Sequence, residues 1–394
     1  MSHQDNTFLH GIKVVDLSRL LPGPFCTQLL ADVGAEVIKI EPPQGGDYAR
    51  HYPPYLPDSH TGAFFDAINR GKKSVAIDLK NPRGVALCKQ LIAQADVVVE
   101  SFRPGVMQRL GLDYDTLKAI NPELVMCSIT GYGQHGDYAK RAGHDINYLA
   151  LSGLLYETRT QHTDQQNTPI IPGFQVADIA GGALYAAFGI VGALFKKLRT
   201  GQGSYLDISM THGTLSLHAG LHANVRQDPG AAKLNLLAGQ IPSYCIYDTS
   251  DGRHMALGAL EPKFWHAFVA LLNVEHLRDE GMTFGTEGQK IRNEVNEIFK
   301  SKTQQQWIEF FAHHDVCCEP VLSPLESLEH ALHTQQQRFI TAQGMTYTTT
   351  PMGIQPTAQH RAPQLGEHTQ EVLAPLMSHD DFEQLLTEHT LYTP

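Results

Sequence analysis

Two short segments of this chain carry side chains that can move a proton. The segment Arg141–Tyr148 reads RAGHDINY and places His144 directly before Asp145. Further along, Asp178 opens a run of small and apolar residues that predicts a helix. An imidazole and a carboxylate on opposite faces of one carbon are what a two-base proton transfer requires. Both groups also have a simpler interpretation, because His144 and Asp178 stand at expected helix starts and would serve there as capping residues.

The composition is typical of a globular protein with a large core. The chain has 394 residues, of which 42% are hydrophobic and 18% charged, and this length predicts more than one domain. The net charge of -11 argues against a general nucleic-acid binder, although it leaves room for a local basic pocket. We therefore expect no nucleic-acid partner.

The cysteines and the apolar runs indicate the cellular setting. The six cysteines form no CxxC pair, which favours reduced thiols and a cytoplasmic protein over a disulfide scaffold. The polar N-terminus does not resemble a signal peptide, and no apolar run reaches membrane-spanning length, so no membrane partner is expected. No HExxH motif or other dense ligand cluster is found, so we expect no metal site.

The first part of the chain alternates strand-like and helix-like segments. Strands are predicted at 12–17, 35–40, 74–79, 96–100, 124–129 and 204–210, and helices at 23–30, 82–95 and 181–198. This rhythm predicts an α/β fold with a parallel sheet, in which ligands bind beyond the carboxyl ends of the strands. The glycine-rich turns match neither GxGxxG nor a Walker loop, so a nicotinamide or ATP enzyme is not indicated.

The second part predicts a different architecture. Residues 244–247 and 255–258 flank the turn 249–252 as in an antiparallel hairpin, and helical segments follow to about residue 328. We predict a large α/β domain over 1–220, a linker over 221–235, and a smaller α+β domain over 236–330. Residues 331–394, rich in short strand-like pieces, are expected to return to the large domain.

Four ordered motifs resemble one known family. They are the opening GIKVVDLSRLLPGPFCTQLLADVGAEVIKIEPPQGGD (11–47), NRGKKS (69–74), ESFRPGV (100–106) and APQLGEHT (362–369). Together they resemble the family III CoA-transferases and the related α-methylacyl-CoA racemases. The resemblance implies a large Rossmann-like domain, a smaller domain, long linkers and an interlocked homodimer. It also implies an acyl-CoA thioester as substrate, with no cofactor beyond the CoA moiety that the substrate itself carries.

Three positions favour the racemase branch of this family. GHDINY, with His144, resembles the racemase segment, and Glu261 in GALEPKF matches the racemase glutamate that pairs with the catalytic histidine. Asp178 holds the position of the acid/base carboxylate in racemases and of the acylated nucleophile in transferases. The resemblance implies that His144 and Asp178 invert the α-carbon of 2-methylacyl-CoA through an enolate. Asp145 would join the histidine network, with its N–H facing the enolate oxygen.

Two alternatives stay open at this point. In a CoA-transferase, Asp178 would form a mixed anhydride and then a thioester with CoA. Glu261 could also be an ordinary acidic residue of a helix start before Pro262.

The CoA contacts follow from the same motifs. Cations that could meet its phosphates, or could equally form a solvated face, are Arg70, Lys72, Lys73 and Arg103. The turn Leu20, Leu21 and Pro22 is expected to supply backbone contacts. Many relatives carry an arginine where this chain has Pro42, and Lys39 or Arg50 is expected to replace it.

Overall fold

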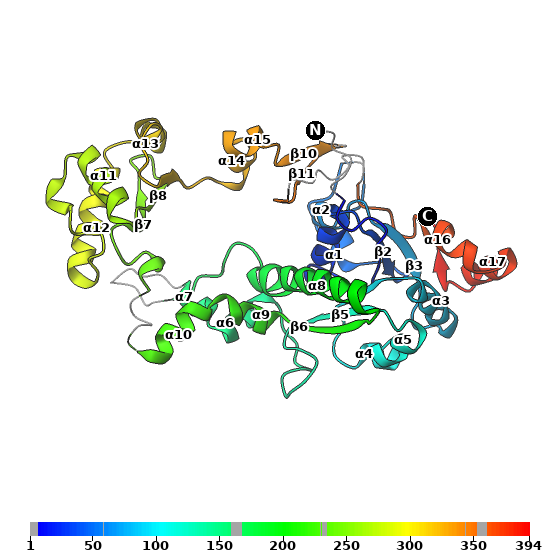
Figure 1. The fold of residues 1–394 in the computed structure, drawn as a ribbon. Helices are drawn as coiled ribbons and strands as arrows, with labels where there is room; N and C mark the ends of the chain where they lie inside the picture. Colours follow the sequence, from blue (N-terminus) through cyan, green and yellow to red (C-terminus); the bar gives the residue numbers. More distant parts are fainter. Residues whose placement is uncertain are drawn as a thin grey trace. The chain divides into compact units, whose positions relative to one another are not determined.

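The computed structural model divides the chain into two compact units (Figure 1). It describes residues 7–57, 59–158, 168–228, 230, 235–342, 344–352 and 361–394. The large unit comprises Met1–Leu154, Pro172–Leu217 and Leu332–Pro394, and the small unit comprises Leu155–Ile171 and His218–Ala331. The chain therefore leaves the large unit twice and returns to it twice.

The large unit is built on a seven-stranded sheet of order β12-β3-β2-β1-β4-β5-β6. The strands are β1 (Lys13–Asp16), β2 (Glu36–Glu41), β3 (Lys73–Ile77), β4 (Val97–Glu100), β5 (Val125–Thr130), β6 (Ser204–Ser209) and β12 (Leu391–Tyr392). All neighbours are parallel except β12, which runs antiparallel to β3. The prediction of a mixed α/β fold with a large parallel sheet is confirmed. The strand order reverses between β1 and β4, which is where such sheets bind ligands.

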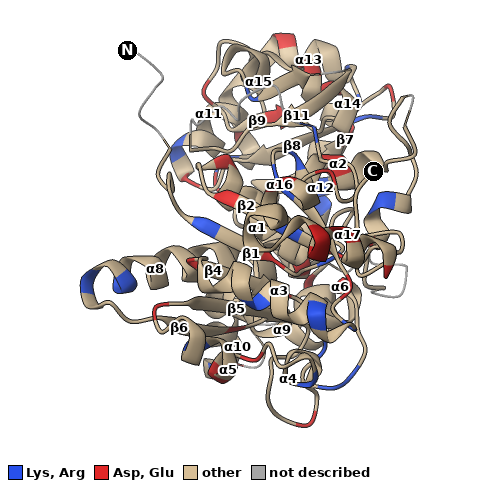
Figure 2. Cartoon of the chain, turned by 90° about the vertical axis from the view of Figure 1, so that its right-hand side faces the viewer, with Lys and Arg blue, Asp and Glu red and all other residues tan. Residues whose placement is uncertain are grey.

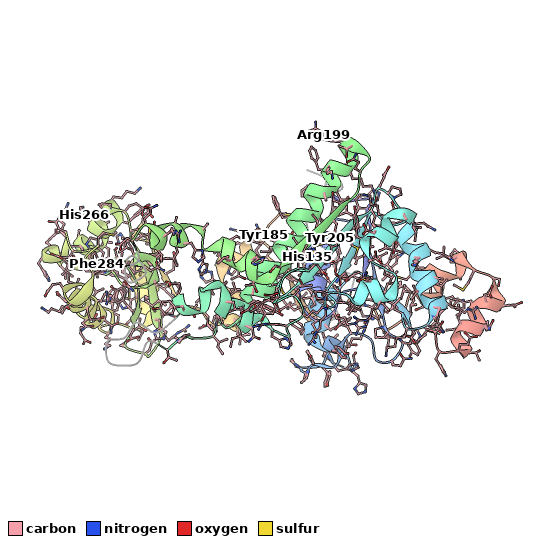
Figure 3. The ribbon with its side chains drawn as sticks, turned by 90° about the horizontal axis from the view of Figure 1, so that it is seen from below. His135, Tyr185, Arg199, Tyr205, His266 and Phe284 are labelled. Carbon is pink, nitrogen blue, oxygen red and sulfur yellow. The ribbon has the colours of Figure 1, made fainter. Side chains whose placement is uncertain are left out.

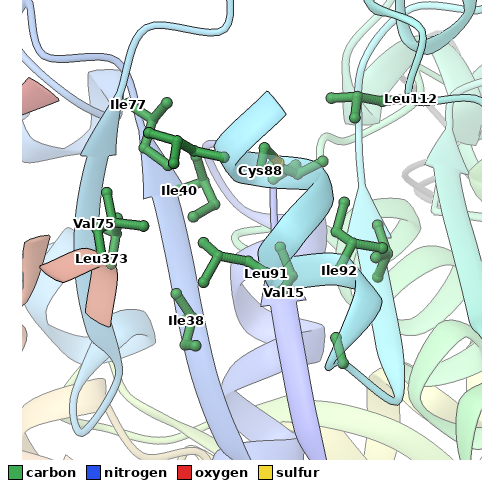
Figure 4. Close-up of a cluster of buried hydrophobic side chains, with 14 of the residues drawn as sticks. Val15, Ile38, Ile40, Val75, Ile77, Cys88, Leu91, Ile92, Leu112 and Leu373 are labelled. Carbon is green, nitrogen blue, oxygen red and sulfur yellow. The ribbon is translucent and has the colours of Figure 1, made fainter. Parts of the chain in front are cut away.

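Helices on the sheet bury its apolar strands. They are α1 (Pro22–Asp32), α2 (Ala63–Asn69), α3 (Pro82–Ala93), α4 (Val106–Leu110), α5 (Tyr114–Ile120), α6 (Asp145–Ser152), α8 (Tyr185–Thr200) and α9 (Met210–Leu217), with the 3₁₀ turn η1 (Tyr48–His51). The close-up in Figure 4 shows Val15, Ile38 and Val75 of the strands against Leu91 of α3. Both α1 and α3 carry proline in the first turn, where the missing N–H has no intrahelical partner to lose.

A π-helical segment, η2 (Ala177–Leu184), runs directly into α8. A Cβ on Gly213 of α9 would lie 1.9 Å from the carbonyl oxygen of Gly181, so only glycine allows η2 and α9 to approach this closely. Figure 3 labels Tyr185 and Arg199 at the two ends of α8. The predicted long apolar helix is confirmed, but its first turns are wider than those of an α-helix.

The outer face of this helix carries an apolar stripe. Leu184, Phe188, Val191, Phe195 and Leu198, spaced alternately by four and three residues, are exposed, Phe188 by 79%. In the described part of the chain, Ala177–Thr200 is the one helix long and apolar enough to cross a membrane. A single such helix is weak grounds for a membrane protein, because core helices of globular proteins pass the same test.

The small unit has an antiparallel sheet of order β7-β8-β9 packed on helices. Its strands are β7 (Tyr244–Asp248), β8 (His254–Gly258) and β9 (Cys318–Pro320), and its helices are α10 (Ala219–Gln227), η4 (Leu236–Ala238), α11 (Pro262–Leu272), η5 (Glu275–Leu277), α12 (Gly285–Phe299), α13 (Gln304–Phe311) and α14 (Pro324–Glu329). Trp265, Phe268, Phe299 and Trp307 form its aromatic core.

The predicted hairpin over 244–258 is confirmed by the β7–β8 pairing. The short strand β9 was not predicted, because three residues carry too little periodicity. Helix α10 occupies the start of the segment predicted as a linker, and residues 229 and 231–234 of that segment lie outside the described residues.

Two short helices lie where the chain passes between the units, α7 (Leu154–Glu157) and α15 (Ala331–Gln335). The last segment adds β10 (Phe339–Ala342), β11 (Met345–Thr348), α16 (Thr369–Leu373), η6 (Ala374–Leu376) and α17 (His379–Thr387) to the large unit. Thr369 Oγ1 accepts a hydrogen bond from the N–H of Ala76 in β3, 2.9 Å away, which ties α16 to the sheet.

Candidate active site

A cavity of about 380 Å³ opens in the large unit beyond the carboxyl ends of β1, β4 and β5. Five of the predicted site residues line it, namely Leu20, Pro22, Arg103, His144 and Asp178. The segments that follow β1, β4 and β5 each contribute to the lining, as the reversal of strand order predicts. The two predicted proton-transfer groups therefore face one cavity.

His144 is held by its backbone at the start of α6. It is the N-cap residue, and the Oδ1 of Asn147 accepts a hydrogen bond from the His144 N–H, 3.0 Å away. The Asn147 N–H in turn donates to the carbonyl oxygen of His144, at 2.8 Å. The imidazole itself is exposed. The capping interpretation and the cavity position thus hold together for His144, because the backbone caps the helix while the ring is left for the cavity.

Two glycines let Tyr148 lock this segment against the end of β5. The Tyr148 hydroxyl donates to the carbonyl oxygen of Gly143 at 2.6 Å, and its ring meets Tyr132 edge-on, with 5.2 Å between the ring centroids. A Cβ on Gly131 would lie 2.3 Å from the Tyr148 ring, and one on Gly143 would lie 2.8 Å from it. The packing of Tyr148 therefore requires glycine at position 143, and this contact fixes the backbone position of the next residue, His144.

Asp178 lies inside the first turn of η2 and is not its N-cap, which is Val176. The predicted capping role of Asp178 is wrong. Instead, the Oδ1 of Asp145 accepts a hydrogen bond from the Asp178 N–H at 2.9 Å, so Asp145 supplies the acceptor that the start of η2 needs. The carboxylate of Asp145 thereby ties α6 to η2 and fixes the backbone from which Asp178 projects.

The same arrangement raises the pKa of Asp178. Burial disfavours the charged form, and the neighbouring Asp145 carboxylate repels it, which together raise the pKa of Asp178 to about 7. Burial also raises the pKa of Asp145, although the backbone N–H groups of Asp178 and Ala177 oppose that change. A carboxyl group with a pKa near 7 can both accept and return a proton at neutral pH.

Glu261 belongs to the small unit, where it is the N-cap residue of α11 and precedes Pro262 at the first helical position. Its side chain is exposed and makes no capping hydrogen bond. The interpretation as a residue of a helix start is confirmed. Its pairing with His144 stays a prediction.

Three of the four predicted phosphate-binding cations have carboxylate partners within the protein. Lys72 is fully buried, and its Nζ bonds Thr27 Oγ1 at 2.7 Å and Asn69 Oδ1 at 2.9 Å, with Asp16 at 3.3 Å. Arg70 is paired with Asp32, and Lys73 with Glu36 and Glu371. None of the three lines the cavity around Asp178. Arg70 and Lys72 are buried, so the structure gives these two a structural role in place of the predicted contact with CoA. Lys73 is partly exposed, and its contact with CoA stays a prediction.

Lys39 and Arg50 do not replace the missing cation at position 42 either. Lys39 is buried against Asp47 at 3.0 Å, and Arg50 against Glu41 at 2.7 Å. The Asp47 carboxylate also accepts the N–H of Leu20, 3.1 Å from Oδ1, so this buried pair positions the turn that lines the cavity. The expectation that Lys39 or Arg50 contacts the ligand is wrong, because both side chains are buried and form ion pairs with Asp47 and Glu41.

Several cavity residues were not predicted. Arg19, Tyr48, Phe102 and Arg141 line it, and a buried glutamate, Glu100, accepts the N–H of Phe102 at 2.7 Å. Burial raises the pKa of Glu100 to about 7. Arg19 directly precedes the predicted turn residue Leu20, so sequence proximity was the available signal. Leu21, by contrast, is buried and does not line the cavity.

The charged side chains are spread over the molecule, and the cavity is lined by groups of several kinds. Figure 2 shows Lys and Arg scattered over many elements, with Asp and Glu among them. Among residues 7–394 as far as they are described, no three His, Cys, Asp or Glu side chains come together as a group that could hold a metal ion. The cavity instead offers guanidinium groups, aromatic rings, an imidazole and a carboxyl group.

The chain resembles characterised proteins over nearly its whole length. The model of CoA-transferase family III matches residues 9–369. Human alpha-methylacyl-CoA racemase is 35% identical over 93% of this chain and 92% of its own length. Human succinyl-CoA:glutarate CoA-transferase is 31% identical over 95% of this chain and 87% of its own length. The crystal structure of a CAIB/BAIF family protein from Brucella suis, 30% identical, covers 95% of this chain and 100% of that one with a TM-score of 0.80. With its fold, its cavity and these relatives taken together, the chain belongs to CoA-transferase family III.

Proposed function

We propose that this protein is an α-methylacyl-CoA racemase, which inverts the α-carbon of 2-methylacyl-CoA thioesters. The observation that carries the proposal is the presence of His144 and Asp178 in one cavity, with the pKa of Asp178 raised to about 7. The racemases of human and mouse, at 35% and 37% identity over 93% of this chain, support it.

In the proposed reaction, one of the two groups removes the α-proton and the other delivers a proton to the opposite face. When His144 is neutral, Asp178 is protonated, and the imidazole takes the proton while the carboxyl group gives its own. The enolate between the two steps carries its charge on the thioester oxygen, where the N–H of Asp145 at the first position of α6 would stabilise it. The groups exchange protonation states at each turnover, so the same pair serves both directions.

The near-neutral pKa of Asp178 matters for this exchange. A carboxyl group at its ordinary pKa of 3.8 would be ionised at neutral pH and would rarely supply a proton. Burial and the charge of Asp145 move its pKa toward neutrality, so a protonated carboxyl group is available to act as the acid. Asp145 thus acts as a positioning residue and also adjusts the acidity of Asp178.

The remaining parts of the proposal rest on the family resemblance. Glu261 would orient the imidazole of His144, and an interlocked homodimer would be the functional form. No cofactor is required, because CoA is part of the substrate. The six free cysteines agree with a reducing, cytoplasmic setting.

A CoA-transferase is the alternative, because its relatives match as well. Human succinyl-CoA:glutarate CoA-transferase is 31% identical over 95% of this chain. In that reaction the Asp178 carboxylate attacks the thioester, releases CoA thiolate and forms a mixed anhydride. The thiolate then attacks the aspartyl carbonyl and expels the first carboxylic acid as its carboxylate, which leaves an aspartyl-CoA thioester that the second carboxylate reopens in the same way. Such a nucleophile works only when it is ionised, and a pKa of about 7 leaves about half of Asp178 in that form at pH 7, so the labelling experiment below decides between the two reactions.

The deciding experiment is proton NMR of one enantiomer of a 2-methylacyl-CoA with the protein in deuterated buffer. A racemase incorporates deuterium at the α-carbon while the opposite enantiomer appears. Inversion should be lost in both His144→Ala and Asp178→Ala, and each variant should still exchange the α-proton of the one enantiomer that its remaining base can reach.

Two controls are available on the loop before α6. His135 and Asp137 are exposed and do not line the cavity, so His135→Ala and Asp137→Ala should invert at the rate of the unmodified protein. Absence of exchange, together with CoA transfer to an added carboxylic acid and a CoA adduct on Asp178 detected by mass spectrometry, would replace the racemase with the transferase.

A further inference from the structure

Arg19 lies between two adjoining cavities of the large unit. It lines the cavity that holds His144 and Asp178, and it also lines a smaller one of about 180 Å³. Phe102 is the other residue shared by both cavities. The smaller cavity is walled mainly by apolar side chains, namely Leu17, Ile40, Pro42, Ile77, Leu79, Val106 and Leu110. A ligand that extends from one cavity to the other must pass Arg19.

The Arg19 guanidinium is positioned by aromatic rings and by its own backbone. It lies over the ring of Phe102 at 5.5 Å and over the ring of Tyr48 at 5.8 Å, measured to the centroids. The N–H of Arg19 donates to the Oγ of Ser101 at 3.2 Å, which joins the turn after β1 to the segment after β4. These contacts hold the side chain without occupying its N–H donors.

Most other basic side chains around this edge of the sheet are paired, and the described ones that are not, Arg103, Arg141 and Lys80, each line only one of the two cavities. Lys39, Arg50, Arg70, Lys72 and Lys73 each have a carboxylate partner within ion-pair distance. In the ranges that the structure describes, Arg19 has no such partner and no side-chain hydrogen bond. A half-buried guanidinium with unused N–H donors is expected to donate them to acceptor atoms of a ligand, since leaving them unpaired is costly.

Phosphate is the chemistry that this group suits. The planar guanidinium donates two parallel hydrogen bonds to phosphate oxygens, and the aromatic rings leave that edge free. On the proposed function, the acyl-CoA carries a thioester at one end, adenine at the other and a diphosphate between them. With the thioester beside Asp178, the apolar slot beyond Arg19 suits the flat adenine ring. We infer that Arg19 binds the diphosphate of the acyl-CoA substrate.

The inference rests on the proposed function, and direct binding of CoA separates the two. Calorimetric titration is made with CoA and with dephospho-CoA, which lacks the 3′-phosphate, and turnover is followed with an S-acylpantetheine, which lacks the nucleotide. Arg19→Ala should weaken both nucleotides alike, by roughly tenfold to a hundredfold, as expected for lost charge-assisted hydrogen bonds. Turnover of the S-acylpantetheine should be unchanged.

Two further variants make the test specific. Arg19→Lys keeps the charge without the bidentate geometry and should recover part of the affinity. Arg109→Ala removes an exposed arginine of α4 that lines neither cavity, and it should bind CoA as the unmodified protein does. A cooperative thermal unfolding transition of Arg19→Ala, close to that of the unmodified protein, is the control that the variant is folded.

Different failures have different meanings. Equal CoA affinity of Arg19→Ala and the unmodified protein would overturn the assignment of Arg19. A loss seen with CoA but not with dephospho-CoA would move the contact to the 3′-phosphate and overturn the diphosphate assignment. If the unmodified protein did not bind CoA at all, the proposed function itself would fail, whatever the behaviour of the Arg19 variants.

Discussion

Replacing Asp178 with asparagine should make the protein more stable at alkaline pH while it abolishes inversion. The carboxyl group has a pKa of about 7 in the folded protein and an ordinary value of 3.8. Below about pH 3.8 it is neutral in both folded and unfolded states and has no effect on stability. As the pH rises toward 7, the unfolded chain releases the proton and the folded protein retains it, so the folded state loses stability. Above about pH 7 both states are ionised, and the loss of folding free energy has reached its full value.

The magnitude follows from the pH interval. Each pH unit between the two pKa values contributes about 1.4 kcal/mol, so the interval from pH 5 to pH 7 gives up to about 2.8 kcal/mol. Because the side chain borders a cavity, solvent reduces this value, and we expect about 1–3 kcal/mol. The Asp178→Asn variant keeps the backbone N–H that donates to Asp145, so it should escape this loss without a new unpaired group.

The assay is chemical unfolding of the unmodified protein and Asp178→Asn at pH 5, 6, 7 and 8, followed by circular dichroism. The stability of Asp178→Asn relative to the unmodified protein should rise over this range and level off above pH 7. Asp137→Asn, which replaces an exposed aspartate outside the cavity, provides the matched control and should follow the unmodified protein. Parallel pH profiles for Asp178→Asn and the unmodified protein would refute the argument that this site raises the pKa of Asp178.

Three further substitutions test the supports of the site. Gly131→Ala places a Cβ against the Tyr148 ring, and we expect a loss of about 1–3 kcal/mol in thermal unfolding together with slower inversion, whereas full stability would contradict the packing argument. Tyr148→Phe removes the hydrogen bond to Gly143, so stability should fall by about 1 kcal/mol and the NMR inversion rate should drop; an unchanged rate would show that this bond does not position His144. Lys72→Met leaves the buried Asp16 carboxylate without this partner, and unfolding should show a loss of about 3–5 kcal/mol. A stable Lys72→Met that binds CoA poorly would restore the predicted phosphate contact.

The parallel sheet could be predicted because its strands are short runs of apolar residues that are buried in the structure. Val14 and Val15 in β1 and Val97, Val98 and Val99 in β4 are almost wholly buried, and such runs bounded by turn residues are a strong local signal. The sequence predicted only that ligands bind beyond the carboxyl ends of the strands, and the strand order seen in the structure narrows this to the ends of β1 and β4.

The wide turns of η2 could not be predicted, because an apolar run looks the same in an α-helix and a π-helix. What distinguishes them is a contact across elements, where Gly181 meets Gly213. The same reason explains the cations. A lysine before a strand has the same sequence signal whether it faces solvent or a buried carboxylate, and the partners of Lys72 and Arg70 lie in β1 and α1, far away along the chain. In both cases, the helix type of η2 and the burial of the cations, the outcome depends on residues that are distant in sequence and meet only in the fold.

The pairing of β12 with β3 has a consequence for how the protein is made. Leu391 pairs with Ile77, so the outer strand of the sheet leaves the ribosome after the six other strands of that sheet. Until then, β3 presents an open edge, and open edges of sheets recruit other chains. The small unit, most of which is the continuous segment His218–Ala331, can fold before the large unit is complete. Pairing of β12 therefore covers the β3 edge of the sheet only at the end of synthesis.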